Sequence, residues 1–303
     1  MKIARRGVTA AVWAALAACP LGAQAPATAF DVASVKRSNA DRPVSNFPLG
    51  PGDAYSPNGG LFSATGFPLA TYISFAYKVL NAQMMEKLPE WVQSERYDIQ
   101  ARAAGNPGKD DMRTMMRALL AERFKLVLHD EDREVPVTAL VVAKAGRLGP
   151  HLQPHPADMP CPTTSVSDIG PANANAVSPA ETVAGGLPAL CGGFLMMPAS
   201  VPGRVKVAAR NVTLDFIAKG LTPGTTLGKP LVDRTGLTGK YDFSLEFTPQ
   251  ANGPMKPGAE AQIDRSGPNF EEAIREQLGL KLEAQKGTIT VMVVDHLERP
   301  SAN

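Results

Sequence analysis

Hydrophobic residues recur at helical spacing in two segments of the chain. The first covers residues 111–124, with Arg113, Arg117 and Glu122 on the opposite, polar face. Its hydrophobic face consists of Met112, Met115, Met116, Leu119, Leu120 and Phe124. The second covers residues 270–278, where Asn269 is the expected N-cap and Gly279 the expected end. Both segments are predicted to be amphipathic helices.

A β-hairpin is predicted after each of these helices. After the first helix, the pattern predicts a strand at 125–129, a charged turn at 130–134 and a β-branched strand at 135–143. After the second helix, the same order is expected over 280–295, with the turn at 286–287.

The order of elements repeats along the chain. Tyr97 and Tyr241 lie in matching strings 144 residues apart, and Leu69 and Leu214 begin matching helices 145 residues apart. A nearly constant offset favours two copies of one module. The predicted fold is therefore α+β: a tandem repeat of two small βαβαββ-like modules, each a mixed sheet with helices packed on one face, joined by a long Pro/Gly-rich loop.

Four segments follow from this organisation. Residues 1–27 are an expected export signal, and residues 28–146 form the first α+β module. Residues 147–203, rich in proline and glycine, form a linker loop that contains a pair of cysteines. Residues 204–303 form the second module, with an insertion expected at 249–267.

The start of the chain has the pattern of an export signal. Lys2, Arg5 and Arg6 precede a short apolar run. Cleavage is expected either at Cys19, which ends a lipobox and would be lipidated, or near residues 25–27, which would release the chain. The protein is therefore expected to be exported to the periplasm or the extracellular space, as a membrane-anchored lipoprotein if Cys19 is modified.

Charge argues against nucleic acid as a partner, and hydropathy argues against a transmembrane helix. The full chain has a net charge of +2, which falls to about −1 when the three basic residues of the signal are removed. No basic stripe with interleaved aromatic residues remains, which argues against nucleic acid. No later apolar run approaches ~18 residues, so no transmembrane helix is expected in the mature chain.

The other two cysteines, Cys161 and Cys191, form an even pair. In an oxidising compartment such a pair predicts a disulfide. The alternative is a pair of metal thiolates, which the absence of CxxC spacing makes the weaker interpretation.

The sequence contains no established catalytic motif. GxSxG, HExxH, CxxC and EF-hand patterns are missing, and residues 224–230 are one residue short of a P-loop. His151 and His155 have the spacing of metal ligands on a helix, but the prolines around them forbid that helix. No catalytic residue, metal site or cofactor is predicted.

Three weaker candidates for a functional site remain, and two of them are histidines. His129 lies beside the acidic residues 130–132, and His296 follows Asp295, so either could form an acid–base pair. The alternative for both is a solvated surface segment.

The third candidate is a ligand-binding site in the string 232–243. There Asp233, Arg234 and Lys240, with two glycines three residues apart, could hold an anion such as a carboxylate. A purely structural turn explains the same residues.

Several strings taken in order resemble a soil-associated family of uncharacterised secreted proteins. They are residues 30–36, Trp91, 96–99, 119–126, 233–243, 277–282 and 294–301. The family has no assigned activity. The resemblance implies export, and it implies relatives in which this domain is fused to membrane metallopeptidases of the β-lactam-receptor type. More loosely, each repeat is similar to the small βαβ interaction domains of secretins and TonB-dependent receptors.

The function predicted from these observations is binding without catalysis. The protein is expected to be a binding or sensing module for an envelope protein or a small ligand, with the cleft between the modules and the disulfide-bearing loop as the binding surface. The alternative is a secreted hydrolase whose site is assembled from dispersed residues, such as His129 or His296 with distant carboxylates.

Overall fold

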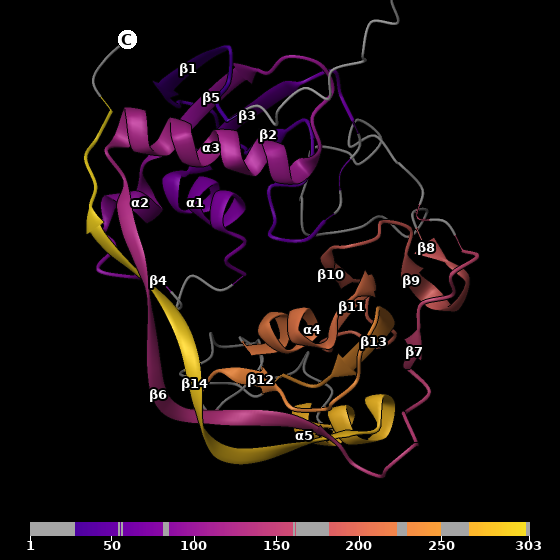
Figure 1. The fold of residues 1–303 in the computed structure, drawn as a ribbon. Coiled ribbons are helices and arrows are strands. Elements are labelled where there is room, and N and C mark those ends of the chain that lie inside the picture. The colour runs from indigo at the N-terminus through magenta and orange to yellow at the C-terminus, as the bar shows by residue number, and fades with distance from the viewer. Residues whose placement is uncertain are drawn as a thin grey trace, which may run out of the picture.

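The protein has a mixed α/β structure with several sheets and few helices (Figure 1). The computed structural model describes residues 28–53, 55, 57–80, 85–159, 161, 182–222, 229–249 and 267–300. The export signal, Cys19 and the predicted insertion lie outside these residues, apart from the ends of the insertion. Within the described part of the chain, no helix is both long and apolar enough to cross a bilayer.

The first sheet has four antiparallel strands in the order β1-β5-β3-β2. These strands are Val32–Arg37 (β1), Arg96–Arg102 (β5), Leu61–Pro68 (β3) and Val44–Ser45 (β2). Three helices belong to this half: Leu69–Tyr77 (α1), Trp91–Ser94 (α2) and Lys109–Phe124 (α3). Figure 1 shows α1 and α3 together on one side of this sheet.

The second sheet is also a four-stranded antiparallel sheet, in the order β10-β11-β13-β7. Its strands are Phe194–Met197 (β10), Val205–Val212 (β11), Tyr241–Phe247 (β13) and Leu152–Pro154 (β7). Its helices are Leu214–Leu221 (α4), Phe270–Ala273 (α5) and the π-helical turn Ile274–Leu278 (η7). Both of these sheets are antiparallel, whereas a mixed sheet was predicted for each module; parallel pairs occur in the third sheet, described below.

Part of the predicted linker is ordered as sheet rather than loop. Besides β7 and β10, it contains the short pair Thr182–Val183 (β8) and Leu187–Pro188 (β9), joined by the 3-10 turn Ala184–Gly186 (η4). A strand of only two to four residues is too short to show the alternation of apolar and polar residues by which a sequence reveals a strand.

Both amphipathic helices form where the sequence predicts them. The α3 helix ends at Lys125, which has the left-handed conformation (φ 52°). At α5, Asn269 and Glu272 form the expected capping box, and Gly279 ends the helical segment with φ 69°. Local interactions decide these boundaries, so the sequence is sufficient to place them.

The two predicted hairpins are wrong. Residues 127–142 form one continuous strand, Val127–Val142 (β6), and residues 280–296 form another, Leu280–His296 (β14). The two strands pair with each other antiparallel over their whole length, so Asp132 lies opposite Thr290 instead of in a turn. Short parallel strands complete this third sheet at its edges, Leu231–Asp233 (β12) and Met85–Glu86 (β4).

The wrong prediction of two turns, at 130–134 and 286–287, has a simple physical cause. The middle of the β6–β14 ribbon is largely exposed, so the charges of residues 130–134 reach water from a strand as well as they would from a turn. Polarity alone therefore could not separate an exposed ribbon from an exposed turn.

Two hydrophobic cores lie at opposite ends of this ribbon (Figure 1). Met292 and Val294 of β14 pack in the first core with α1 and α3. Leu140 of β6 packs in the second core with Leu280 and helix α4. The first core is thus closed by β14, which follows the helical segment α5–η7 of the second half in the sequence. The second core is closed by β6, which follows helix α3 of the first half.

Candidate functional site

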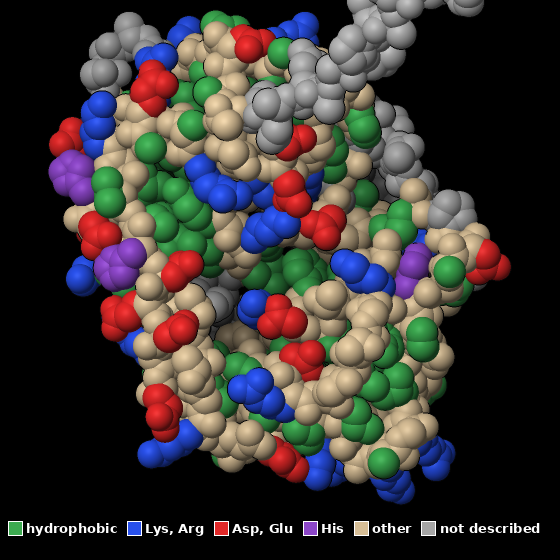
Figure 2. Space-filling view, in the orientation of Figure 1, with side chains coloured by type: hydrophobic (Ala, Val, Ile, Leu, Met, Phe, Trp, Pro, Cys, Tyr) green, Lys and Arg blue, Asp and Glu red, His purple; other side chains and the backbone are tan. Residues whose placement is uncertain are grey.

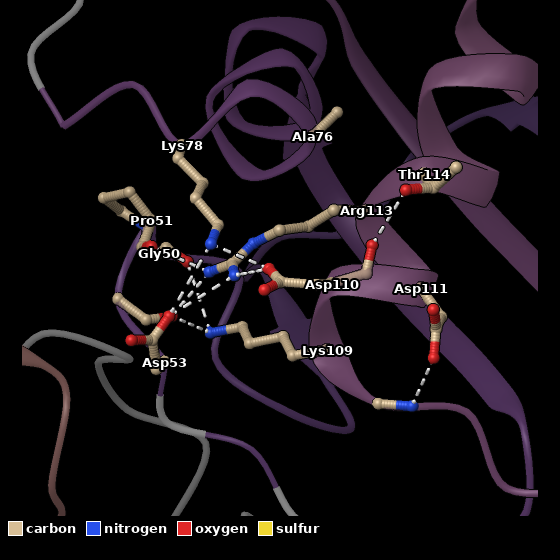
Figure 3. Close-up of polar contacts among 12 residues, drawn as sticks. Gly50, Pro51, Asp53, Ala76, Lys78, Lys109, Asp110, Asp111, Arg113 and Thr114 are labelled. Carbon is tan, nitrogen blue, oxygen red and sulfur yellow. Dashed lines mark hydrogen bonds and ion pairs between the residues drawn. The ribbon is translucent and has the colours of Figure 1, made fainter. Parts of the chain in front are cut away.

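Charged side chains from both halves converge on the loop of residues 50–53. We call this group the Asp53 cluster; it consists of Asp53, Lys78, Lys109, Asp110 and Arg113, which Figure 3 shows, together with Lys240. Figure 2 shows a hollow between the two halves, with hydrophobic side chains inside it and charged side chains gathered along it.

Arg113 is the anchor of the loop. Its side chain, on α3, is completely buried. Nη2 donates hydrogen bonds to the carbonyl oxygens of Pro51 (2.7 Å) and Gly52 (2.6 Å), and Nη1 donates to Asp110 (2.6 Å). The guanidinium also lies over the ring of Phe75, 5.7 Å from its centroid.

The sequence pattern placed Arg113 on the polar face of the helix, and that prediction is wrong. A signal was present, since Arg113, Met116 and Leu120 are spaced three and four residues apart and share one helix face. A buried arginine is accommodated there because the loop carbonyls accept from Nη2 and Asp110 accepts from Nη1, although buried Nε has no hydrogen-bond partner among the residues that the structure describes.

Lys109 is the second buried cation of the cluster. Its ammonium group donates to the carbonyl oxygens of Gly52 (2.5 Å) and Gly50 (3.3 Å). Burial, and then the nearby charge of Arg113, lower the pKa of Lys109 to about 7. Strongly shifted lysines of this kind are concentrated at functional sites, although ion networks that only stabilise a fold also produce them.

Gly52 brings the loop into contact with the second half. A Cβ atom at this position would lie 1.7 Å from the carbonyl oxygen of Gly192, so no other residue fits without movement of backbone. The next residue, Asp53, carries the carboxylate around which the cations gather. It lies 3.5 Å from Nη1 of Arg113 and 3.9 Å from the ammonium groups of both Lys78 and Lys240.

The arrangement has an excess of positive charge. Four cations face two carboxylates, those of Asp53 and Asp110, which gives a formal charge of +2 when Lys109 is protonated and +1 when it is not. The side chains of Lys78 and Lys240 are each 46% exposed, and Lys78 also forms an ion pair with Asp110 at 2.8 Å. Lys78 comes from the end of α1 and Lys240 from the start of β13. The cluster can therefore attract an anionic group to the junction of the two halves.

The residues of the predicted anion site are not brought together as a nest. Asp233 accepts hydrogen bonds from the amide and the hydroxyl of Thr235, while the amide of Arg234 donates to Leu140. Gly236 and Gly239 have the positive φ expected for a tight turn. Lys240 points to the Asp53 cluster, which the sequence did not indicate.

Three of the four histidines have partners outside their own strings, whereas His296 has its partner within its own string. His129 lies 2.8 Å from Asp295 across the ribbon, His296 lies 2.8 Å from Glu298, and all four side chains are substantially exposed. His151 and His155 flank β7 and diverge, His151 toward Gln277 and His155 toward Asp242. The P-loop-like string lies mostly outside the described residues.

A cavity of about 300 Å³ lies between residues 29–33 and helix α3. Its lining combines Met115 and Leu119 with Glu122 and Arg123, so it does not favour one ligand chemistry.

The Cys161–Cys191 disulfide is present in the structure, as predicted. It joins the segment after β7 to the segment before β10, across a sequence separation of 30 residues.

Removing this disulfide is expected to lower the free energy of unfolding by about 3–4 kcal/mol, because the unfolded chain gains the entropy of an open loop. The comparison is Cys161→Ser/Cys191→Ser against the wild type in urea, with chelator present. Equal midpoints and slopes for the two proteins would show that the bond does not restrict the unfolded chain.

The comparisons with known proteins place the chain in a family without assigning it an activity. No curated protein and no solved structure matches the chain. A family model described as "Protein of unknown function (DUF3738)" matches residues 70–297, which include β5 of the first sheet, both central strands of the second sheet and the ribbon. The chain belongs to this family of proteins of unknown function.

Proposed function

We propose that this protein is an exported envelope component that binds, without chemical conversion, a ligand carrying anionic groups at the Asp53 cluster. One observation carries the proposal: two half-exposed lysines, Lys78 and Lys240, come from different halves of the molecule and meet beside Asp53. A carboxylate or phosphate that contacts both ammonium groups would gain two charge-assisted contacts, in competition with Asp53 for both lysines and with Asp110 for Lys78. The ligand can be a small anion or an acidic segment of an envelope protein.

The predicted tandem repeat is part of this proposal, and the strand orders support it. The order β1-β5-β3-β2 corresponds to β7-β13-β11-β10 when the second sheet is followed from its other edge. In both sheets the pairing of the two central strands is interrupted by a bulge, at Gly66 in β3 and at Asn211 in β11. Both residues have positive φ, 78° and 55°.

An aspartate binds the amide of each bulge. Asp98 accepts a hydrogen bond from Gly66 at 2.9 Å, and Asp242 accepts one from Asn211 at 2.8 Å. We therefore infer two modules, 28–146 and 204–303, that exchange their last strands through the ribbon; the sheet of the second module also takes in β7 and β10 from residues 147–203. The Asp53 cluster lies where the modules meet, so a bound ligand would fix their relative arrangement.

Export and sensing form the cellular part of the proposal. The basic and apolar start of the chain supports export, with or without lipidation of Cys19. Resemblance to soil-associated secreted proteins, and to domains fused to membrane metallopeptidases, supports a sensing role. The hydrolase alternative is less favoured, because His296 pairs with Glu298 while Asp233 and Asp242 have other partners.

Native mass spectrometry of the full-length gene product, recovered from its own envelope fraction, tests the proposal. The wild type is expected to carry an additional non-covalent mass. In Lys78→Ala/Lys240→Ala the occupancy is expected to fall about tenfold or more, because two charged contacts are lost.

The matched control is Lys36→Ala/Lys286→Ala, which removes the same charge from exposed positions on β1 and β14. This variant is expected to retain the ligand. A bare wild-type protein, or equal loss from both double variants, would contradict binding at the Asp53 cluster.

A further inference from the structure

His155, Cys161 and Cys191 bring three potential metal ligands together, separate from the Asp53 cluster. Their ligand atoms all lie within 4.8 Å of one another. Nε2 of His155 is 3.8 Å from Sγ of Cys161. The two sulfurs form the disulfide in this structure, so they cannot bind a metal in this state.

A carboxylate holds the histidine in the orientation that a metal site requires. Nδ1 of His155 lies 2.7 Å from Oδ1 of Asp242, and both side chains are only 8% exposed. The same oxygen accepts the amide of Asn211, which fixes the carboxylate. With Nδ1 donating to Asp242, the lone pair of Nε2 faces the sulfurs. Metal-binding histidines are oriented by such carboxylates.

The distances suit a tetrahedral ion once the disulfide is open. Zinc bonds of ~2.1 Å to nitrogen and ~2.3 Å to sulfur give edges of about 3.6 Å between N and S and about 3.8 Å between two sulfurs. The nitrogen already has this separation from Cys161. Two thiols that are no longer bonded must move apart to a comparable distance, because their van der Waals surfaces repel.

Contacts other than the disulfide hold both ends of the site. The amide of His155 donates to the carbonyl of Lys240, which ties the histidine to the start of β13. Buried Arg210 donates to the carbonyls of Pro188 and Ala189, just before Cys191, and the amide of Gly192 donates to the carbonyl of Arg210. Cys191 and His155 therefore keep their places when the S–S bond is broken.

We propose that this protein has a redox-gated metal site: the oxidised form holds the disulfide, and the reduced form binds one Zn²⁺ through His155, Cys161 and Cys191. A dithiol reductant supplies two electrons and two protons, becomes a disulfide itself and leaves two cysteine thiols. Zinc then displaces the two thiol protons and bonds to both thiolates and to Nε2. Water completes the tetrahedron. The disulfide and the metal thiolates that the sequence offered as alternatives become two states of one site.

Cobalt(II) is the probe, because tetrahedral thiolate coordination gives it intense visible absorption. The full-length protein is reduced with a phosphine, which is oxidised to phosphine oxide as the thiols form, and is then titrated with Co²⁺ and Zn²⁺. We expect one cobalt per reduced chain, with a thiolate charge-transfer band, displacement by zinc, and no such band from the oxidised protein.

Three variants locate the site. His155→Ala is expected to weaken cobalt binding about 100-fold and Asp242→Asn about tenfold. His151→Ala, four residues from His155 but turned toward Gln277, is the matched control and should bind as the wild type does. Binding that is equal in the oxidised and reduced proteins, or insensitive to His155→Ala, would overturn the proposal.

A melting experiment covers the case in which reduction loosens the fold. Zinc is expected to raise the melting temperature of the reduced wild type relative to the same protein in chelator, and to leave reduced His155→Ala unchanged. Should the reduced chain stay unfolded, or melt at the same temperature with and without zinc, the metal site does not exist.

Discussion

Replacing Arg113 by methionine is expected to lower the free energy of unfolding by about 3–5 kcal/mol. Methionine fills most of the volume but donates no hydrogen bond, so the carbonyl of Pro51 loses the partner that Arg113 provides and that of Gly52 loses one of two. The contact with Phe75 is lost as well. Urea denaturation at neutral pH measures the change.

Arg117→Met is the matched control, because it makes the same chemical change one turn farther along α3. Arg117 is exposed, donates to the carbonyl of Ala76 and lies over Tyr77. Its replacement is expected to cost about 1 kcal/mol or less. Similar losses for the two variants would mean that the loop of residues 50–53 does not depend on Arg113.

Lys109 is expected to make the protein more stable as the pH rises from 7. Its pKa is lowered to about 7 in the folded protein from an ordinary value of 10.5. Between these values the unfolded lysine binds a proton that the folded one has lost, so the unfolded state is the one that binds more protons and stability increases with pH. The gain from this group is up to about 4 kcal/mol between pH 7 and 10.

The measurement compares urea denaturation of the wild type and Lys109→Met across that range, since other titrating groups cancel in the difference. In the variant the carbonyl of Gly52 keeps its bond from Arg113, so the fold is expected to persist. Lys36→Met, at an exposed position on β1, should follow the wild-type profile. Parallel profiles for wild type and Lys109→Met would show that Lys109 keeps its proton in the folded protein.

Both predictions concern the base of the proposed binding site rather than its exposed rim. Arg113 and Lys109 hold the backbone of the loop, whereas Lys78 and Lys240 face solvent. Weakening the loop therefore tests how the site is built, and the lysine double variant tests what it binds. The two sets of experiments are independent.

The sequence was sufficient wherever a structure depends on neighbouring residues. The helix α3 follows from its hydrophobic spacing, and the cap of α5 from Asn269 and Glu272. The glycine turn at 236 and 239 follows from the need for positive φ. The disulfide was predicted from the number of cysteines and the expected compartment, which need no knowledge of the fold.

Tertiary structure alone decided which distant segments meet. An exposed ribbon and an exposed turn have the same polarity, so only the pairing of β6 with β14 shows that the strands continue. Arg113 is buried because a loop about 60 residues earlier offers its carbonyl oxygens. Lys240 reaches Asp53, and His155 reaches Asp242, for the same reason. Such contacts gain their energy from partners remote in sequence, and a local pattern contains no information about a partner that lies elsewhere in the chain.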